Sequence, residues 1–498
     1  MMRRWCLAGS LLSLLLLSSA GAEIVETEIQ VDGTRGERYD IELHAVAPKP
    51  PVLEVSLLPP LSEKQPGNAA PLYYRAILSA SQKFQQMKDP QDFWADWESW
   101  MKMPLDEIPV AKLEERLEPF QEALRETAMA ARRSTCEWDF PLRESKTEIM
   151  QIYLNEVQEC RSLARLLMLR IRGNMAAGKR AEAIADLQTG YALAQNVGGR
   201  GFFVNHLVGL AIAQQMHRAT LELIALEDSP NIYWSLTMLP TPLIDSKHAL
   251  DTEMNLLRSM FPEIYHARDS KENFSRSYWD EQLRSLVNRW IEQQPKSDGK
   301  PSGGNNLLQS LAYQGMALSQ APRIKKELVS EMGYTQKVVD AMPDSRAVLL
   351  HAAIKCDQIR DEVFAPFGLP YYQAAKFYEQ SKQHQRTDGF FAPESLVTSW
   401  IGSSKYVHIA IARNDQWIEA LRFIESLRDY AAAEGVFPAR LDELSGLPAP
   451  NSSYTGKPFE YERDKKDPTI ARFSMGEAGY FYEFVLKLAP PNPQASKE

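Results

Sequence analysis

The sequence predicts a mainly α-helical protein with a short β element at its N-terminus and a small α+β module at its C-terminus. Apolar residues recur every three or four positions through 61–292 and again through 307–414, which is typical of helical hairpins packed in a repeat-like array. From Val25 to Val31 the residues alternate between a face of Val25, Thr27, Ile29 and Val31 and a polar face of glutamates and Gln30, which indicates a strand. The segment 415–498 holds a long amphipathic helix, a glycine and then short alternating runs.

Residues 1–22 have the pattern of a cleaved export signal. Two arginines at positions 3 and 4 precede an apolar run over 6–17, and Ala20-Gly21-Ala22 supplies the small residues that a signal peptidase accepts. The alternative is a membrane anchor, but serines interrupt this run and it is shorter than the roughly 20 apolar residues that an anchor needs. We therefore expect an exported chain, periplasmic or secreted, with no transmembrane helix after cleavage.

The charge of the chain argues against two classes of partner. Its formal net charge is −9, and lysine and arginine never form a block of more than a few residues. Nucleic acids and anionic membranes are bound by concentrated positive charge. We expect neither as a partner.

The N-terminal β element covers 23–60. It contains three alternating segments, "EIVETEIQV", "RYDIELHAV" and "PVLEVSLLP", with Asp32-Gly33 as the turn between the first two. Three short strands bury too little surface to stand alone, so they must pack on another part of the chain.

A helical domain follows over 61–292, and one hairpin near 163–195 stands out in it. Gly178, Glu182, Ala183, Ile184 and Leu187 match positions of the tetratricopeptide repeat, which this hairpin resembles. The match departs where the repeat requires other residues, at Ile171 and Gly190, and no second copy follows at the 34-residue period. The resemblance implies a helical-repeat-like fold here and does not establish an array.

The segment 293–306, "QQPKSDGKPSGGNN", reads as a linker or mobile loop because its residues offer no apolar face. We place the main domain boundary there. A second helical region is expected over 307–414.

The closing segment 415–498 resembles the soluble part of type II secretion pseudopilins. The resemblance rests on a long helix that ends at Gly435, on "FP" at 437–438, on Leu441 and Leu444, and on "GKPFEYE" over 456–462. It implies a helix packed on a small antiparallel sheet, in which "FEYE" and "ARFSM" are strands joined by a turn at 464–468. The hydrophobic assembly helix that begins a pseudopilin is missing, so the resemblance covers the local fold and not filament assembly.

A broader resemblance covers nearly the whole mature chain. It rests on segments such as "LLPPLSEKQPGNAAPLYYRA" (57–76), "PNIYWSLTMLPTPLID" (230–245) and "RDEVFAPFGLPYYQA" (360–374). These are similar to an uncharacterised family of large exported bacterial helical proteins. The resemblance brings no activity, cofactor or substrate.

Three cysteines lie beyond the export signal, and two readings of them stay open. In an oxidising compartment Cys136 and Cys160 would close a short loop with a disulfide worth about 3 kcal/mol. The alternative is that these two residues and Cys356 are buried thiols that pack as small hydrophobic side chains.

Recognisable catalytic motifs are missing from the sequence. No two histidines stand at metal-ligand spacing, and neither a nucleophile elbow nor a glycine-rich phosphate loop is found. Asp464 and Asp467 are weak candidates for calcium, which needs several oxygen ligands together. We therefore assign no catalytic residue, cofactor or metal site, and an enzyme is less expected than a non-enzyme.

Two aromatic and proline-rich segments are the candidate interaction surface. Aromatic rings suit protein interfaces, but they also fill the junctions between packed helices, and the sequence leaves both readings open. The residues concerned are Tyr73, Tyr74, Phe364, Phe367, Tyr371 and Tyr372.

The function expected from these observations is that of a non-catalytic binding or scaffold protein of the bacterial envelope, whose partner is another envelope protein or a peptide. One alternative is an envelope-acting hydrolase with an unrecognised acid–base site. A weaker alternative, suggested by the closing segment, is an accessory of a secretion system.

Overall fold

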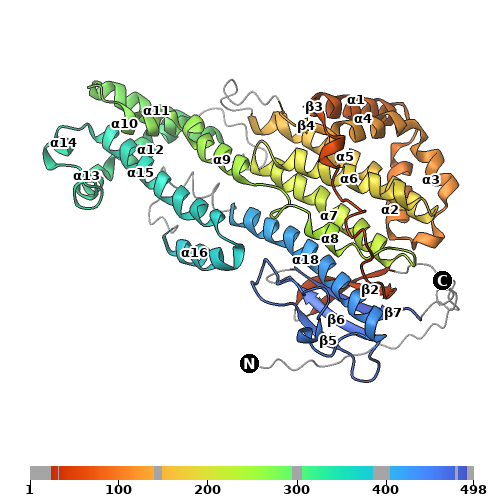
Figure 1. Ribbon diagram of the computed structural model, residues 1–498. Coiled ribbons are helices and arrows are strands. Elements are labelled where there is room, and N and C mark those ends of the chain that lie inside the picture. The colour runs from red at the N-terminus through yellow and green to blue at the C-terminus, as the bar shows by residue number, and fades with distance from the viewer. Residues whose placement is uncertain are drawn as a thin grey trace.

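The computed structural model describes residues 24–31, 33–138, 149–293, 306–384, 404–476 and 480–490. It confirms a mainly helical chain with a small β component at both ends. The expected signal peptide and most of the expected linker lie outside these residues. Figure 1 shows a layer of helices from the first half of the chain, a projecting arm of later helices, and a sheet packed against one long helix.

The helical layer is built by seven helices, which bury their apolar faces on one another. Its α5–α6 hairpin turns at Gly178, whose φ of +70° suits a glycine. A hairpin is thus present where the sequence predicts one, and its tetratricopeptide character stays a prediction. The helices are α1 (Ala70–Gln86), α2 (Pro90–Lys102), α3 (Val110–Leu117), α4 (Gln121–Ala131), α5 (Ile149–Ala176), α6 (Arg180–Gly198) and α7 (Phe203–Ala225).

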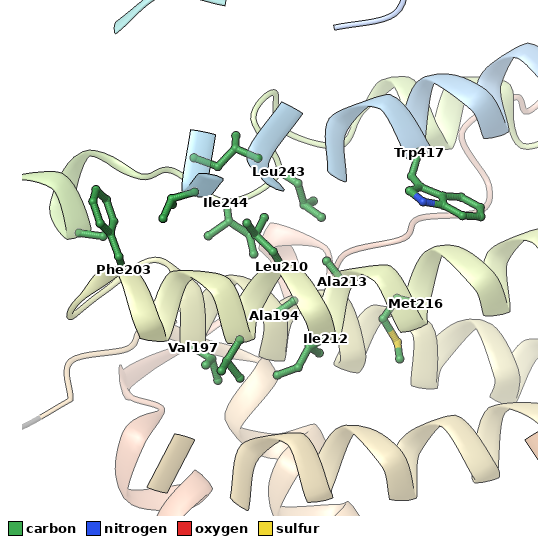
Figure 2. Close-up of a cluster of buried hydrophobic side chains, with 14 of the residues drawn as sticks. Ala194, Val197, Phe203, Leu210, Ile212, Ala213, Met216, Leu243, Ile244 and Trp417 are labelled. Carbon is green, nitrogen blue, oxygen red and sulfur yellow. The ribbon is translucent and has the colours of Figure 1, made fainter. Parts of the chain in front are cut away.

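Glycines allow α6 and α7 to pack at very short range. A Cβ atom on Gly209 would lie 2.6 Å from the Cα of Gly198, and one on Gly190 would lie 2.0 Å from the sulfur of Met216. Gly190, which departs from the tetratricopeptide pattern, is therefore needed to receive Met216. Figure 2 shows Met216 and Ile212 on one side of α7. Leu210 points from the opposite side of α7 toward Leu243 and Ile244, which belong to a later segment.

The arm combines helices from both sides of the expected linker. Ser310 of α12 donates to Asn288 of α11 at 2.5 Å, and Arg268 of α10 pairs with Asp357 of α15. The segment 293–306 therefore does not separate two independently packed regions. The helices of the arm are α9 (Lys247–Met260), α10 (Pro262–Asp269), α11 (Arg276–Gln293), α12 (Asn306–Ser319), α13 (Ala321–Ser330), α14 (Gln336–Asp340), α15 (Asp344–Phe364) and α16 (Tyr371–His384). The short helix α8 (Tyr233–Thr237) lies outside the arm and packs on α18 (Ser404–Glu434) (Figure 1).

One five-stranded sheet joins the two ends of the chain, in the order β1-β2-β7-β6-β5. The sequence predicts strands at both ends but not that they share a sheet. β2 runs parallel to β7, and the other neighbours are antiparallel. The strands are β1 (Ile24–Val31), β2 (Thr34–Leu43), β5 (Glu460–Arg463), β6 (Ile470–Met475) and β7 (Tyr480–Leu488).

The closing module has the expected helix, turn and strands, but its helix starts earlier than 415. α18 (Ser404–Glu434) ends at Gly435, whose φ is +75°. The turn between β5 and β6 is held by Asp464, which accepts from the amides of Lys466 and Asp467 at 2.8 and 3.0 Å. The likeness to pseudopilins stays a prediction.

Two local predictions from the sequence are wrong. The third expected N-terminal strand, over 51–59, is irregular, and it begins with a turn in which the amide of Glu54 donates to the carbonyl of Pro51 at 3.1 Å. A two-stranded sheet of β3 (Gln65–Asn68) and β4 (Arg133–Thr135) lies within the predicted helical domain. The sequence does not reveal these strands, because three or four residues are too few to show an alternation of apolar and polar side chains.

A fully buried ion pair on α18 holds three distant segments together. Arg428 donates to Glu425 at 2.8 Å, and neither side chain is exposed. The same guanidinium donates to the carbonyls of His44 at 2.9 Å and Ser229 at 3.0 Å, and Glu425 accepts from the amide of Ile232 at 3.0 Å. The N-terminal segment after β2 and the segment after α7 are thus both tied to α18.

Replacing Arg428 tests this role. In Arg428→Leu the Glu425 carboxylate and two carbonyls stay buried without their donor, so we expect a loss of about 3–5 kcal/mol in the free energy of unfolding. Urea denaturation followed by circular dichroism measures it. Arg440→Leu is the matched control, because that arginine pairs with Asp442 on the surface. Equal midpoints for the two variants would contradict the assignment.

Candidate functional site

A cavity of about 500 Å³ opens between α7, α18 and β7. Its volume lies in the range of sites that bind small molecules or single side chains of a partner. Tyr406 is 62% exposed and Leu207 is 40% exposed, so the cavity has an accessible mouth. The lining residues are Leu207, Leu210, Ala211, Gln214, Tyr406, Ile409, Ala410, Arg413, Asn414, Trp417, Tyr480 and Tyr482.

The lining follows from the periodicity of each element. The residues of α7 stand at intervals of three and four from Leu207 to Gln214, and those of α18 do so from Tyr406 to Trp417, so each set forms one helix face. Tyr480 and Tyr482 are two apart on β7 and share one face of the sheet. Two helix faces and one sheet face therefore meet without filling the space between them.

Rigid aromatic packing forms the inner wall. Trp417 is 2% exposed, and its ring lies edge-on to Tyr482 at 5.1 Å, to Phe484 at 5.6 Å and to Tyr39 at 5.7 Å between ring centroids. Figure 2 shows Trp417 extending from its helix toward α7. Because four rings from three elements pack together, this wall is preorganised.

The polar groups that line the cavity are amides, hydroxyls, the indole of Trp417 and one guanidinium. Gln214 donates to the hydroxyl of Tyr482 at 3.1 Å, and Asn414 donates to the carbonyl of Leu210 at 3.2 Å. Among the described residues of the lining, Arg413 alone is charged. In this part of the chain the lining has neither a carboxylate nor an imidazole that would serve as a general acid or base.

A neutral histidine lies on the buried side of α7. His217 is fully buried, and its Nδ1 lies 2.9 Å from the hydroxyl of Tyr191, which is 3.0 Å from that of Thr220. Burial lowers the pKa of His217 to about 4, although the neighbouring Asn414 amide opposes the shift. His217 is therefore uncharged at neutral pH and belongs to a polar network within the core.

The first pair of predicted interface tyrosines packs inside the helical layer. Tyr73 is fully buried, stacks on Trp138 with 5.8 Å between ring centroids, and accepts from Asn196 at 2.8 Å. Tyr74 lies edge-on to the same tryptophan at 5.4 Å. The interface prediction is thus wrong for Tyr73, because its ring fills the space between α1 and α6.

The second predicted set lies where the arm meets α7 and α18. Phe364 is buried, so it is not an interface residue either. Phe367 stacks on Phe203 at 5.5 Å, and Tyr371 stacks on Tyr454 at 4.8 Å. Tyr372 is 44% exposed, whereas the other five predicted rings are buried or half-buried. None of the six lines the cavity.

No disulfide joins Cys136 and Cys160 in the structure, where both are buried in one hydrophobic core, as is Cys356. Both of the first two lie near the hydroxyl of Tyr73, whose pKa they help to raise after burial itself. The structure thus has the alternative arrangement, buried thiols, and the disulfide stays a prediction for an oxidising compartment.

Carboxyl groups with strongly raised pKa values lie outside the cavity lining. Burial raises the pKa of Asp415 and of Glu419 on α18, and of Glu253 on α9, to about 7 each. Each accepts from a backbone amide: from Leu243 at 3.1 Å, Ser453 at 2.6 Å and Phe203 at 2.9 Å respectively. These groups tie loops and helix ends to the core.

Sequence reasoning missed the cavity because its residues come from three distant segments. Two signals were present, the stripe from Tyr406 to Trp417 and the alternating tyrosines of "YFYEF" after 479. Neither shows from sequence alone that the two segments meet.

In comparisons with known proteins, no family model, no curated protein and no solved structure matches the chain. Within the described residues, none of the helices combines the length and the apolar run needed to span a bilayer. In the same residues, three or more histidine, cysteine, aspartate or glutamate side chains nowhere gather as metal ligands do.

Alkylation distinguishes a buried free thiol at Cys136 from a disulfide between Cys136 and Cys160. Burial raises the pKa of its thiol from 9.0 to about 12, so at pH 8 its thiolate fraction is about a thousandfold below the ordinary one. We expect no modification by iodoacetamide in the native protein and rapid modification in 6 M guanidinium, read by mass spectrometry of the Cys136 peptide. Protection that persists in denaturant until a reductant is added would show a disulfide instead.

Asp415→Asn tests the buried carboxyl. Asp415 keeps its proton in the folded state up to about pH 7 but loses it near pH 4 when unfolded, so its contribution to stability falls as the pH rises between these values. The asparagine is neutral and can still accept from Leu243. Relative to the wild type, the variant should gain up to about 1.4 kcal/mol per pH unit between pH 5 and 7, measured by urea denaturation. Asp415→Ala should show the same pH dependence but be less stable than Asp415→Asn at each pH, because it removes the acceptor for the amide of Leu243. A pH-independent difference for Asp415→Asn would contradict the raised pKa.

Proposed function

We propose that this chain is a non-catalytic binding or scaffold protein of the bacterial envelope. In this proposal the cavity between α7, α18 and β7 receives an apolar or aromatic side chain of another envelope protein or peptide. Export is supported by the leader pattern of residues 1–22. The binding role is supported by the chemistry and shape of the cavity.

The observation that carries the proposal is the aromatic lining of an open cavity. Trp417 and Tyr482 are held in place by their neighbours, so a bound group would meet rings that need no rearrangement. Buried aromatic walls with a few polar groups at the edge are typical of the centres of protein interfaces. General acid–base chemistry is most often carried out by imidazole or carboxylate groups, and among the described residues none of these lines the cavity.

The strongly perturbed carboxyls favour a structural role as well. Asp415 and Glu419 have pKa values near those of a general acid, but both accept hydrogen bonds from loop amides and neither lines the cavity. We therefore prefer binding to hydrolysis.

Filling the cavity tests the proposal. Ala410 and Ala211 line it on opposite helices, so Ala410→Phe and Ala211→Phe should each block it while α7 and α18 keep their other contacts. The probe is 1-anilinonaphthalene-8-sulfonate, an aromatic anion, and its fluorescence with the purified protein measures occupancy. We expect each variant to weaken binding at least tenfold.

Ala433→Phe is the matched control, because it adds the same ring at an exposed position on the same helix. Envelope proteins crosslinked to the wild type should be lost from Ala410→Phe and kept by Ala433→Phe. Equal capture by both variants would overturn the proposal. Hydrolysis of an envelope polymer that Asp415→Asn abolishes and Ala410→Phe leaves intact would favour the enzyme instead.

A further inference from the structure

The outer edge of the five-stranded sheet is a second surface with a defined geometry. Within the described part of the chain, β1 pairs with β2 on one side and with no strand on the other. β1 has eight residues and contains neither proline nor lysine, and Val25 and Val31 are 44% and 42% exposed. Most proteins shorten or block such an edge, because its unpaired amides and carbonyls accept another strand. β5, at the opposite end of the sheet, has only four residues.

The pairing of β1 with β2 shows which backbone groups point outward. Val31 and Thr34 are register partners across a connection of two residues. A two-residue hairpin places a hydrogen-bonded pair beside its turn, and such pairs alternate along the ladder. Val31, Ile29, Thr27 and Val25 therefore bond to β2. The amides and carbonyls of Gln30, Glu28, Glu26 and Ile24 point to the outer edge.

The edge strand β1 carries a negative charge, that of Glu28, which has no cation paired with it among the described residues. Glu28 lies directly opposite Glu37 in the register, and like charges in that position destabilise a sheet. Glu37 accepts from the hydroxyls of Tyr39 and Tyr480 at 2.6 Å each, and Glu26 pairs with Arg218. Among the described residues no hydrogen bond or ion pair reaches Glu28. Lys102 has an electrostatic interaction with Glu28, but its ion pair is with Glu98, at 2.8 Å.

We propose that β1 binds an extended segment of a partner as an added strand, and that this segment carries basic side chains at alternate positions. The outward backbone groups supply the main-chain hydrogen bonds of strand addition. A lysine or arginine beside Glu28 offsets its repulsion with Glu37. A second copy of this chain fits less well, because antiparallel pairing of two β1 strands brings the glutamates of both copies together. The outer edge of β1 is separate from the cavity, so an experiment that contradicts one of the two proposals leaves the other untouched.

The probe is a fluorescein-labelled peptide of four valine–lysine repeats, titrated with the full chain and followed by fluorescence anisotropy. The same peptide with glutamate in place of lysine is the charge control. We expect the basic peptide to bind at least tenfold more tightly than the acidic one, and to weaken as the salt concentration rises from 0.1 to 0.5 M. Equal binding of the two peptides would overturn the choice of partner.

Two variants separate strand addition from simple attraction to an acidic protein. Gln30→Pro removes one outward amide and no charge, and Gln30→Ala keeps the amide, so we expect a tenfold or greater loss of affinity for the first and less than twofold for the second. Glu28→Lys should stabilise the hairpin by opposing Glu37 with a cation, and should still lower the affinity at least tenfold. Since that variant is not weakened in folding, its loss cannot come from unfolding.

Other outcomes contradict the proposal. Gln30→Pro and Gln30→Ala with the same affinity would show attraction without strand pairing. A concentration-dependent dimer in sedimentation velocity that Gln30→Pro abolishes would assign the edge to a second copy of the chain.

Discussion

The buried pair of Glu425 and Arg428 is the constraint on which the arrangement of the chain depends. Two charges removed from water are costly unless each is fully hydrogen-bonded, and here the bonds come from backbone groups that lie far apart in sequence. The segment after β2 and the segment after α7 must both reach α18 before the pair is satisfied. The pair therefore selects one arrangement of the ends of the chain around this helix.

That arrangement also creates the cavity. The buried pair ties α18 to the segment after α7, and Asn414 of α18 donates to the carbonyl of Leu210 on α7, so the two helix faces are held on either side of the cavity. β7 closes the third side with tyrosines that are part of the sheet. The cavity walls are thus regular elements and not loops, which favours a site whose shape is kept when it is empty.

Local features of the fold could be predicted from sequence, and features that join distant segments could not. The hairpin at Gly178, the helix end at Gly435 and the turn at Asp464 follow from short-range chemistry, and each lies where the sequence places it. The shared sheet, the buried pair and the cavity depend on which segments meet, and local residue patterns do not show that. The aromatic residues show the same limit: the sequence indicates that Tyr73 and Phe364 are important contacts, but not whether they face solvent or the core.

The parallel pairing of β2 with β7 has a consequence for how the protein is made. Tyr480 bonds to Glu37 across a separation of 443 residues, so the centre of the sheet is formed by the first and last parts of the described chain. Contacts of such long range form late, because closing a loop of this length is entropically unfavourable. During synthesis, the edge of β2 that later pairs with β7 stays exposed until β7 has been made. A chain that stops before residue 480 would keep its helical layer but leave its N-terminal hairpin without a place to dock, and it would be a natural substrate for proteolysis.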